Sequence, residues 1–135
     1  DGTTGTLFAT GNELDPRGLA FDRAGNRYVA TQFGNAVQCY SANGIPLGTF
    51  AHAGLRDPFA IAFDATGDLY ISNQFDGTIR RYSAAGKDLG VFATVSTKDA
   101  NPTGLAFLPV PEPGHLTMLL GAGGIRFVSK RRRQI

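Results

Sequence analysis

Hydrophobic residues in this chain alternate with polar ones over short runs, and turn-forming residues separate the runs. Between residues 15 and 93 no apolar pattern reaches the length of a helix. Alternation with a period of two over such lengths is typical of half-buried β-strands. The pattern predicts eight strands, at Leu19–Asp22, Tyr28–Thr31, Val37–Ser41, Leu47–Ala51, Ile61–Asp64, Leu69–Ser72, Thr78–Ser83 and Leu89–Ala93.

The same pattern occurs twice at a spacing of 42 residues. Phe21, Tyr28, Tyr40 and Phe50 of the first copy correspond to Phe63, Tyr70, Tyr82 and Phe92 of the second. Partial copies flank them, since Phe8 lies 42 residues before Phe50 and Phe107 lies 44 residues after Phe63. Four antiparallel strands in a repeat of about 42 residues are typical of a propeller blade. The sequence therefore predicts an all-β fold, a β-propeller with about two full four-stranded antiparallel blades, partial blades beside them, and an incomplete ring.

The segments "DRAGN" and "DATGD" follow the first strand of each copy and predict tight turns. Asp22 and Asp64 are expected to cap these turns through their side chains, while Gly25 and Gly67 supply a positive φ. The ligand spacing of an EF-hand calcium loop is absent, and no metal or cofactor site is expected.

The segment "DPFAIAFDATGDLYIS" at Asp57–Ser72, and more loosely Asp15–Thr31, resembles the NHL-repeat family of β-propellers. The resemblance implies blade geometry and ligand binding on one face. Streptogramin lyases and gluconolactonase-like enzymes are related propellers, but none of their catalytic residues can be transferred to this chain. We expect no catalysis by this chain. The alternative is part of a propeller enzyme, a lyase or lactonase-like hydrolase, whose active site needs blades that are absent here.

Loops between the second and third strands share one face of a blade with the loops that join blades, because successive loops of a meander alternate ends. The pair Gln32 and Phe33 recurs there as Gln74 and Phe75. An amide beside an exposed ring suits a carbohydrate or a peptide. Alternatively, the rings pack between blades and the amides brace the loops. The binding-face candidates are Gln32, Phe33, Asn35, His52, Arg56, Asn73, Gln74, Phe75, Asp76 and Asn101.

The last 26 residues, 110–135, differ from the repeats and are expected to form a separate tail after a propeller domain of residues 1–109. Prolines in the segment Val110, Pro111, Glu112 and Pro113 cannot propagate a sheet, so the fold is expected to end near Leu108. Leu116–Val128 is apolar except for Thr117 and Arg126 and predicts a short helix of roughly 20 Å. A bilayer core is about 30 Å thick, which makes this helix marginal as a permanent anchor.

This tail resembles the PEP-CTERM sorting signal of Gram-negative bacteria. The resemblance rests on the Pro-Glu-Pro segment, the apolar run and a basic stop formed by Lys130, Arg131, Arg132 and Arg133. It implies export, processing by an exosortase near Pro-Glu-Pro, transient membrane contact through the tail, and delivery to the cell surface or an extracellular polysaccharide matrix. The alternatives are a basic localisation or nucleic-acid tag, a simple tail anchor and a frayed terminus.

The net positive charge of the chain comes from this tail. Five of the 13 cationic side chains lie in the last ten residues, so residues 1–125 hold eight against 11 acidic ones, a net charge of −3. A nucleic-acid-binding face on the propeller is therefore not expected. Cys39 is the one cysteine and is expected to be a buried thiol. No secretory signal peptide is recognisable from Asp1 onward, as expected if a signal was removed or if the chain is a fragment.

Two full blades cannot close a propeller ring by themselves, and an open array leaves strand edges and blade faces bare. Three arrangements fit the sequence: the C-terminal part of a longer propeller, self-assembly into a closed ring, or a short open array. The sequence as a whole predicts an exported, surface-sorted binding or structural module of the cell envelope or extracellular matrix. Its expected partners are an exosortase-type enzyme and a polysaccharide or protein ligand.

Overall fold

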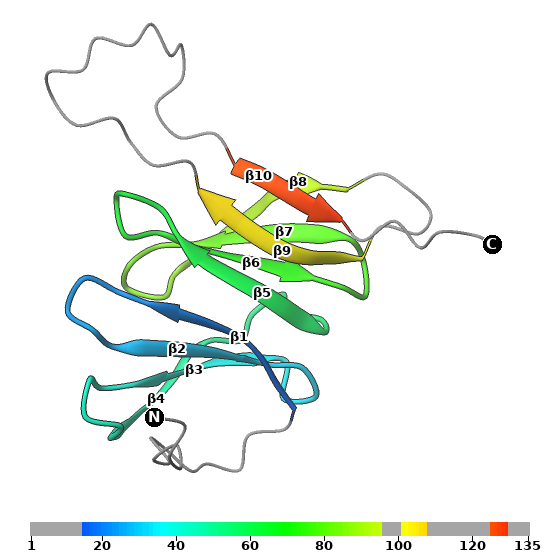
Figure 1. The fold of residues 1–135 in the computed structure, drawn as a ribbon. Coiled ribbons are helices and arrows are strands. Elements are labelled where there is room, and N and C mark those ends of the chain that lie inside the picture. Colours follow the sequence, from blue (N-terminus) through cyan, green and yellow to red (C-terminus); the bar gives the residue numbers. More distant parts are fainter. Residues whose placement is uncertain (1–14, 96–100, 108–124, 130–135) are drawn as a thin grey trace, which may run out of the picture.

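The computed structural model describes residues 15–95, 101–107 and 125–129, and these residues form antiparallel β-sheets (Figure 1). The strands of blade 1 are β1 (Pro16–Phe21), β2 (Arg27–Thr31), β3 (Ala36–Tyr40) and β4 (Pro46–Ala51). Blade 2 consists of β5 (Pro58–Phe63), β6 (Leu69–Asn73), β7 (Thr78–Tyr82) and β8 (Asp88–Thr94). The third blade pairs β9 (Pro102–Phe107) with β10 (Ile125–Ser129). Within these ranges no helix is long and apolar enough to cross a membrane.

The eight predicted strands are confirmed, each to within three residues at either end. Each blade is a meander in which neighbouring strands along the chain pair, in the orders β1-β2-β3-β4 and β5-β6-β7-β8. The first strands begin earlier than predicted, at Pro16 and Pro58, because a register shift precedes Leu19 and Ile61 and interrupts the alternation there. Figure 1 shows the three sheets stacked one above another.

Aromatic side chains at the repeated positions join each blade to the next. The Tyr28 ring packs edge-on against Phe50 of its own blade at 4.9 Å and against Phe63 of blade 2 at 4.8 Å, between ring centroids. Tyr70 repeats the arrangement with Phe92 at 5.0 Å and with Phe107 of the third blade at 4.9 Å. Edge-to-face packing of this kind is favourable beyond the burial of area alone. The 42-residue spacing of aromatics is thus the spacing of the joints between blades.

The first strands of adjacent blades also pass very close to each other. A Cβ atom on Gly18 of β1 would lie 2.3 Å from the carbonyl oxygen of Phe59 in β5. No real Cβ contact is that short, so this approach requires glycine. Because of this contact, the packing of blade 1 on blade 2 depends on a residue without a side chain.

The third blade corrects one expectation about the tail. Ile125–Ser129 is a strand, so the predicted helix over Leu116–Val128 is wrong for residues 125–128, while residues 116–124 lie outside the described part. Phe107 pairs with Ile125, as Phe63 pairs with Leu69 and Phe21 with Arg27. Strand β10 therefore stands where the second strand of a blade belongs. The third repeat therefore has a second strand and, contrary to the prediction, does not end after its first. The reason is that the backbone N–H and C=O groups along the edge of β9 need hydrogen-bond partners, which a neighbouring strand can supply and a helix cannot. The domain boundary predicted between residues 109 and 110 also lies outside the described part.

The turns follow the predicted chemistry. Asp22 Oδ1 accepts hydrogen bonds from the backbone N–H groups of Ala24 and Asn26, both at 2.9 Å. Asp64 does the same for Thr66 at 2.8 Å and Asp68 at 3.0 Å. These turns hold the first two strands of each blade in register at the end opposite to the candidate site.

Candidate functional site

The loops expected to share one end of the blades do lie together. The backbone N–H of Gln32 donates to the backbone carbonyl oxygen of Asp15 at 2.9 Å. In the same way, the backbone N–H of Gln74 donates to the backbone carbonyl oxygen of Asp57 at 2.9 Å. Each loop between second and third strands is thereby fixed to the residue that directly precedes the first strand of the same blade. We call this end of the described blades the rim.

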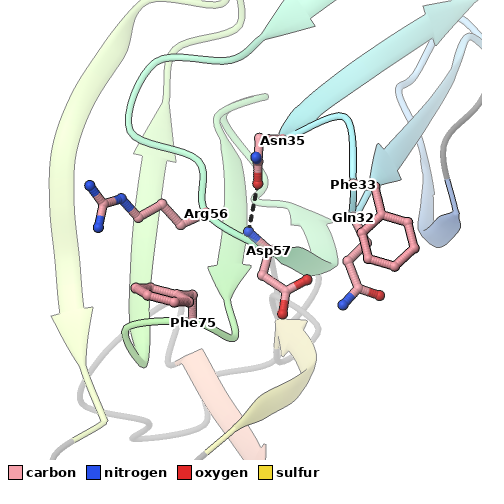
Figure 2. A pocket seen from close by; sticks show the side chains of 6 residues that line it. All are labelled: Gln32, Phe33, Asn35, Arg56, Asp57 and Phe75. Carbon is pink, nitrogen blue, oxygen red and sulfur yellow. Dashed lines mark hydrogen bonds between the residues drawn. The ribbon is translucent and has the colours of Figure 1, made fainter.

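An open hollow of about 420 Å³ lies on the rim between blades 1 and 2 (Figure 2). Its lining comes from the β2–β3 loop, the loop that joins the two blades, and the β6–β7 loop. The lining residues are Gln32, Phe33, Asn35, Arg56, Asp57 and Phe75. We call this feature the rim hollow. Five of its six residues are among the sequence-predicted binding candidates, and Asp57 is the addition.

The two phenylalanines of the rim hollow are exposed. Phe33 is 71% and Phe75 is 73% accessible to solvent, so the alternative in which these rings pack between blades does not hold. That alternative does describe Gln32, whose Oε1 accepts a hydrogen bond from Arg17 Nε at 2.6 Å. The Gln32 amide thus differs in role from the Phe33 ring beside it.

The Asp57 side chain points into the hollow, between Phe75 on one side and Gln32 on the other (Figure 2). Its backbone is held in the left-handed region at φ 55°, and its N–H donates to Asn35 Oδ1 at 2.8 Å. Among the described residues no side chain or backbone group forms a hydrogen bond or ion pair with its carboxylate. The carboxylate is therefore held in place and left available.

The equivalent aspartate of blade 1 is neutralised. Asp15 Oδ2 forms an ion pair with the Arg17 guanidinium at 2.6 Å. Phe59 occupies the position of Arg17 in blade 2, and the Arg17 guanidinium lies 5.5 Å from its ring centroid. An arginine in one repeat and a phenylalanine in the next thus decide which aspartate is available.

Arg56 contributes a cation to the other side of the hollow. Its guanidinium lies 5.7 Å from the Phe75 ring centroid, and it extends away from Asp57 in Figure 2. Its backbone N–H donates to Asn73 Oδ1 at 3.1 Å. In the described ranges no carboxylate pairs with this guanidinium. Adjacent residues of opposite charge therefore face different parts of one hollow.

Other predicted candidates have structural roles or lie elsewhere on the rim. Asn73 is fully buried and donates through Nδ2 to the Gly54 carbonyl at 3.0 Å. Asp76 caps its own loop, where Oδ1 accepts from the Thr78 N–H at 3.0 Å. The remaining candidates, His52, Gln74 and Asn101, do not line the hollow.

Two titratable side chains away from the rim, Cys39 and Tyr82, are buried. Cys39 is buried, as predicted, and burial raises the pKa of its thiol. Burial also raises the pKa of the Tyr82 hydroxyl, to about 12, and that hydroxyl donates to the Ala53 carbonyl. In the part of the chain that the structure describes, no group of three or more His, Cys, Asp or Glu side chains could hold a metal ion.

Asp57 is not among the predicted binding candidates because an Asp–Pro pair occurs at the start of both repeats and belongs to the repeated pattern of the blades. A signal was nevertheless present, since the residue two positions later is Arg17 in one repeat and Phe59 in the other. A carboxylate that loses its nearest cation is a candidate for binding a ligand group instead.

Stacked four-stranded meanders with aromatic joints define this chain as a β-propeller. Virginiamycin B lyase from Staphylococcus aureus is similar in structure, with a TM-score of 0.61 and 16% identity over 76% of this chain and 34% of that one. Regucalcin from Agrobacterium tumefaciens, described as a calcium-binding protein, is similar at a TM-score of 0.57 and 21% identity, over 70% of this chain and 34% of that one. The computationally designed Ika4 protein has a TM-score of 0.57 and 16% identity, over 78% of this chain and 64% of the design.

The chain spans about a third of the length of the two natural proteins that it resembles. No protein-family profile matches its sequence, and no curated protein matches it. These similarities establish the propeller fold.

Proposed function

We propose that this chain is a binding module that uses the rim hollow, with a carbohydrate or a peptide as the ligand. The observation that carries the proposal is the exposure of Phe33 and Phe75, two large rings at equivalent loop positions on either side of one hollow. Exposed aromatic rings beside polar groups are typical of binding surfaces, where ring burial supplies affinity. The surrounding Asn35–Asp57 hydrogen bond keeps the lining in shape before a ligand arrives.

Replacing each ring by alanine tests the proposal. Phe33→Ala and Phe75→Ala are expected to weaken binding of ligands captured by the full chain about ten-fold or more, because each loses a buried aromatic contact. The captured ligands come from arrays of glycans and of random peptides. Ile45→Ala is the matched control, since Ile45 is 61% exposed in the β3–β4 turn at the end opposite to the rim. Equal capture by all three variants would contradict a rim site.

We further propose that the protein is exported and sorted to the cell envelope or matrix. The support is the order of Pro111-Glu112-Pro113, an apolar run and the terminal Lys130–Arg133. After cleavage near Pro-Glu-Pro, strand β10 would stay attached only through its pairing with β9. To test this proposal, the full chain is fused to an export signal and expressed in cells that have an exosortase and in cells that lack one. A mass decrease that needs both the exosortase and Glu112 supports sorting, and an unchanged mass in both strains contradicts it.

A second candidate function is part of a propeller enzyme, and likeness to virginiamycin B lyase is the observation that favours it. A lactonase-like hydrolase of this fold would need a divalent metal ion at the mouth of the central channel that a closed ring of blades encloses. Thermal unfolding of the full chain with and without Ca²⁺, Mg²⁺ or Zn²⁺ tests that version. A rise of the unfolding temperature that saturates at micromolar metal supports it, because an ion that binds only the folded state stabilises it.

A further inference from the structure

We infer that the ligand of the rim hollow is an uncharged polysaccharide, bound through the hydroxyl groups of its sugar rings. The inference rests on the proposed function, since it names the class of ligand for the same site. It follows from three properties of the lining: its charges, its surface and its place on the chain.

Charge argues against a ligand with a net charge. Asp57 presents a carboxylate and Arg56 a guanidinium, and neither has an ion-pair partner among the described residues. A cationic ligand drawn to Asp57 meets repulsion from Arg56, and an anionic ligand drawn to Arg56 meets repulsion from Asp57. A sugar hydroxyl donates to a carboxylate and accepts from a guanidinium, so different rings of one neutral chain can satisfy the two groups without repulsion.

The Asn35 amide extends the donor set. Its Oδ1 is already used by the Asp57 N–H, and the Nδ2 group forms no hydrogen bond to a described residue. The hollow thus offers a charged acceptor and two kinds of donor, which a ring with several hydroxyls matches. Charged partners make hydroxyl hydrogen bonds stronger than neutral partners do.

The apolar part of the lining fits the C–H faces of sugar rings. The rings of Phe33 and Phe75 each provide a flat apolar surface. The Arg56 guanidinium lies over the Phe75 ring but not over the Phe33 ring. The lining residues lie in loops, outside the bounds of the strands, so the hollow offers no strand edge for an extended peptide backbone. This arrangement favours a sugar over a peptide.

The repeat favours a polymer over a single sugar. Phe33 and Phe75 occupy the same place in adjacent blades, so they are separated by one blade along the rim. A chain of sugars that lies along the rim contacts both rings, and binding at two linked points exceeds binding at one. Affinity is therefore expected to rise with the number of sugar units until both rings are covered.

Gel electrophoresis of the full chain through immobilised polysaccharides tests this inference. The neutral probes are dextran, laminarin and galactomannan, the anionic probe is alginate, and the cationic probe is chitosan. The expected result is retardation by at least one neutral probe, with little change between 50 and 500 mM salt, since a neutral ligand has no charge to screen. Shorter oligosaccharides of the retarding polymer should compete less well than longer ones.

Two variants that each remove one charged side chain show whether the ligand is neutral, cationic or anionic. Asp57→Asn and Arg56→Gln are each expected to weaken binding of the neutral probe about ten-fold, because each loses a hydrogen bond to a charged group. A cationic ligand would instead lose affinity with Asp57→Asn and gain it with Arg56→Gln, and an anionic ligand would show the reverse. Asp68→Asn is the matched control, because its carboxylate pairs with Arg81 at the end of blade 2 opposite to the rim.

The outcomes separate this inference from the proposed function. Opposite effects of the two charge variants, or no retardation by any neutral probe, overturn the uncharged polysaccharide. If Phe33→Ala and Phe75→Ala still abolish binding of a charged polymer or a peptide, the rim site stands and only its ligand class is wrong. If the ring variants bind as well as the full chain does, both proposals fail.

Discussion

At the scale of single residues, the two repeats share their strand order and turns, and side-chain differences at a few positions shape the candidate site. Asp15 and Asp57 each directly precede a first strand, and their backbones lie in the left-handed region at φ 59° and 55°. One is paired with Arg17, and the other, with Phe59 at the corresponding position, faces the rim hollow without a partner among the described residues. We therefore propose Asp57 as a binding group, because Phe59 stands where blade 1 has the cation that neutralises Asp15.

The turn aspartates at the opposite end predict how stability depends on pH. Burial by itself would raise the pKa of Asp22 and of Asp64, but hydrogen bonds from side chains and backbone N–H groups outweigh it and lower both. A lowered pKa in the folded state contributes stability above the ordinary value of 3.8, and that contribution is lost as the pH falls through the folded pKa. The urea midpoint is therefore expected to be steady from pH 7 to 5 and to fall below about pH 4.

Asparagine substitutions at both turns check this assignment. The double variant Asp22→Asn and Asp64→Asn should have a lower midpoint at pH 6 and a flatter decline in acid, since it has fewer carboxylates to protonate. If the double variant declines between pH 6 and pH 3 as steeply as the original chain, other carboxylates govern the acid limb.

At the scale of elements, the joint between blades consists of an aromatic contact and a close approach of two strands. Tyr28 reaches Phe63 across the joint, and Gly18 lets β1 pass against the backbone of β5. Each repeat carries the same tyrosine, but position 60, the equivalent of Gly18, is an alanine. The requirement for glycine therefore belongs to one joint and does not follow from the repeat.

Gly18→Ala is expected to destabilise the chain by about 1–3 kcal/mol, because its methyl group would have to displace the backbone of β5. Thermal unfolding measures the loss, and the near-ultraviolet circular dichroism of the chain should weaken as the joint loosens and the Tyr28 ring loses its fixed contacts. Gly48→Ala is the matched control, since an added Cβ there meets no atom within 4 Å and only its φ of 98° opposes the change. Equal near-ultraviolet spectra for Gly18→Ala and the original chain would argue against the close approach.

At the scale of the whole molecule, the described blades form an open stack. Leu19 and Phe21 of blade 1 are 55% and 54% exposed, while their equivalents Ile61 and Phe63 pack against the core between the blades. At the other side, β10 completes the first pair of strands of the third blade. In the part of the chain that the structure describes, the outer face of blade 1 therefore carries exposed apolar side chains at positions that are packed in blade 2.

Hydrogen exchange tests the placement of β10. A chain that stops after residue 124 should exchange the β9 amides at least ten-fold faster than the full chain, because the ladder to β10 is lost. Amides of β6 and β7 are the internal control, since both strands are paired on either side within blade 2. Unchanged protection of β9 would show that β10 does not pair with it in solution.

The sequence by itself determined the blades. Alternation, turn residues and the 42-residue spacing depend on neighbours along the chain, so they located the eight strands to within three residues and brought five of the six hollow residues onto one face. The tertiary structure decided what depends on contacts between distant segments. It showed that the rings of Phe33 and Phe75 face solvent, that Arg17 neutralises Asp15 while Asp57 stays available, and that Ile125–Ser129 pairs with β9 as a strand. Period and spacing cannot report these outcomes, because the apolar run at the tail suits a helix as well as a strand and only the unpaired edge of β9 selects between them.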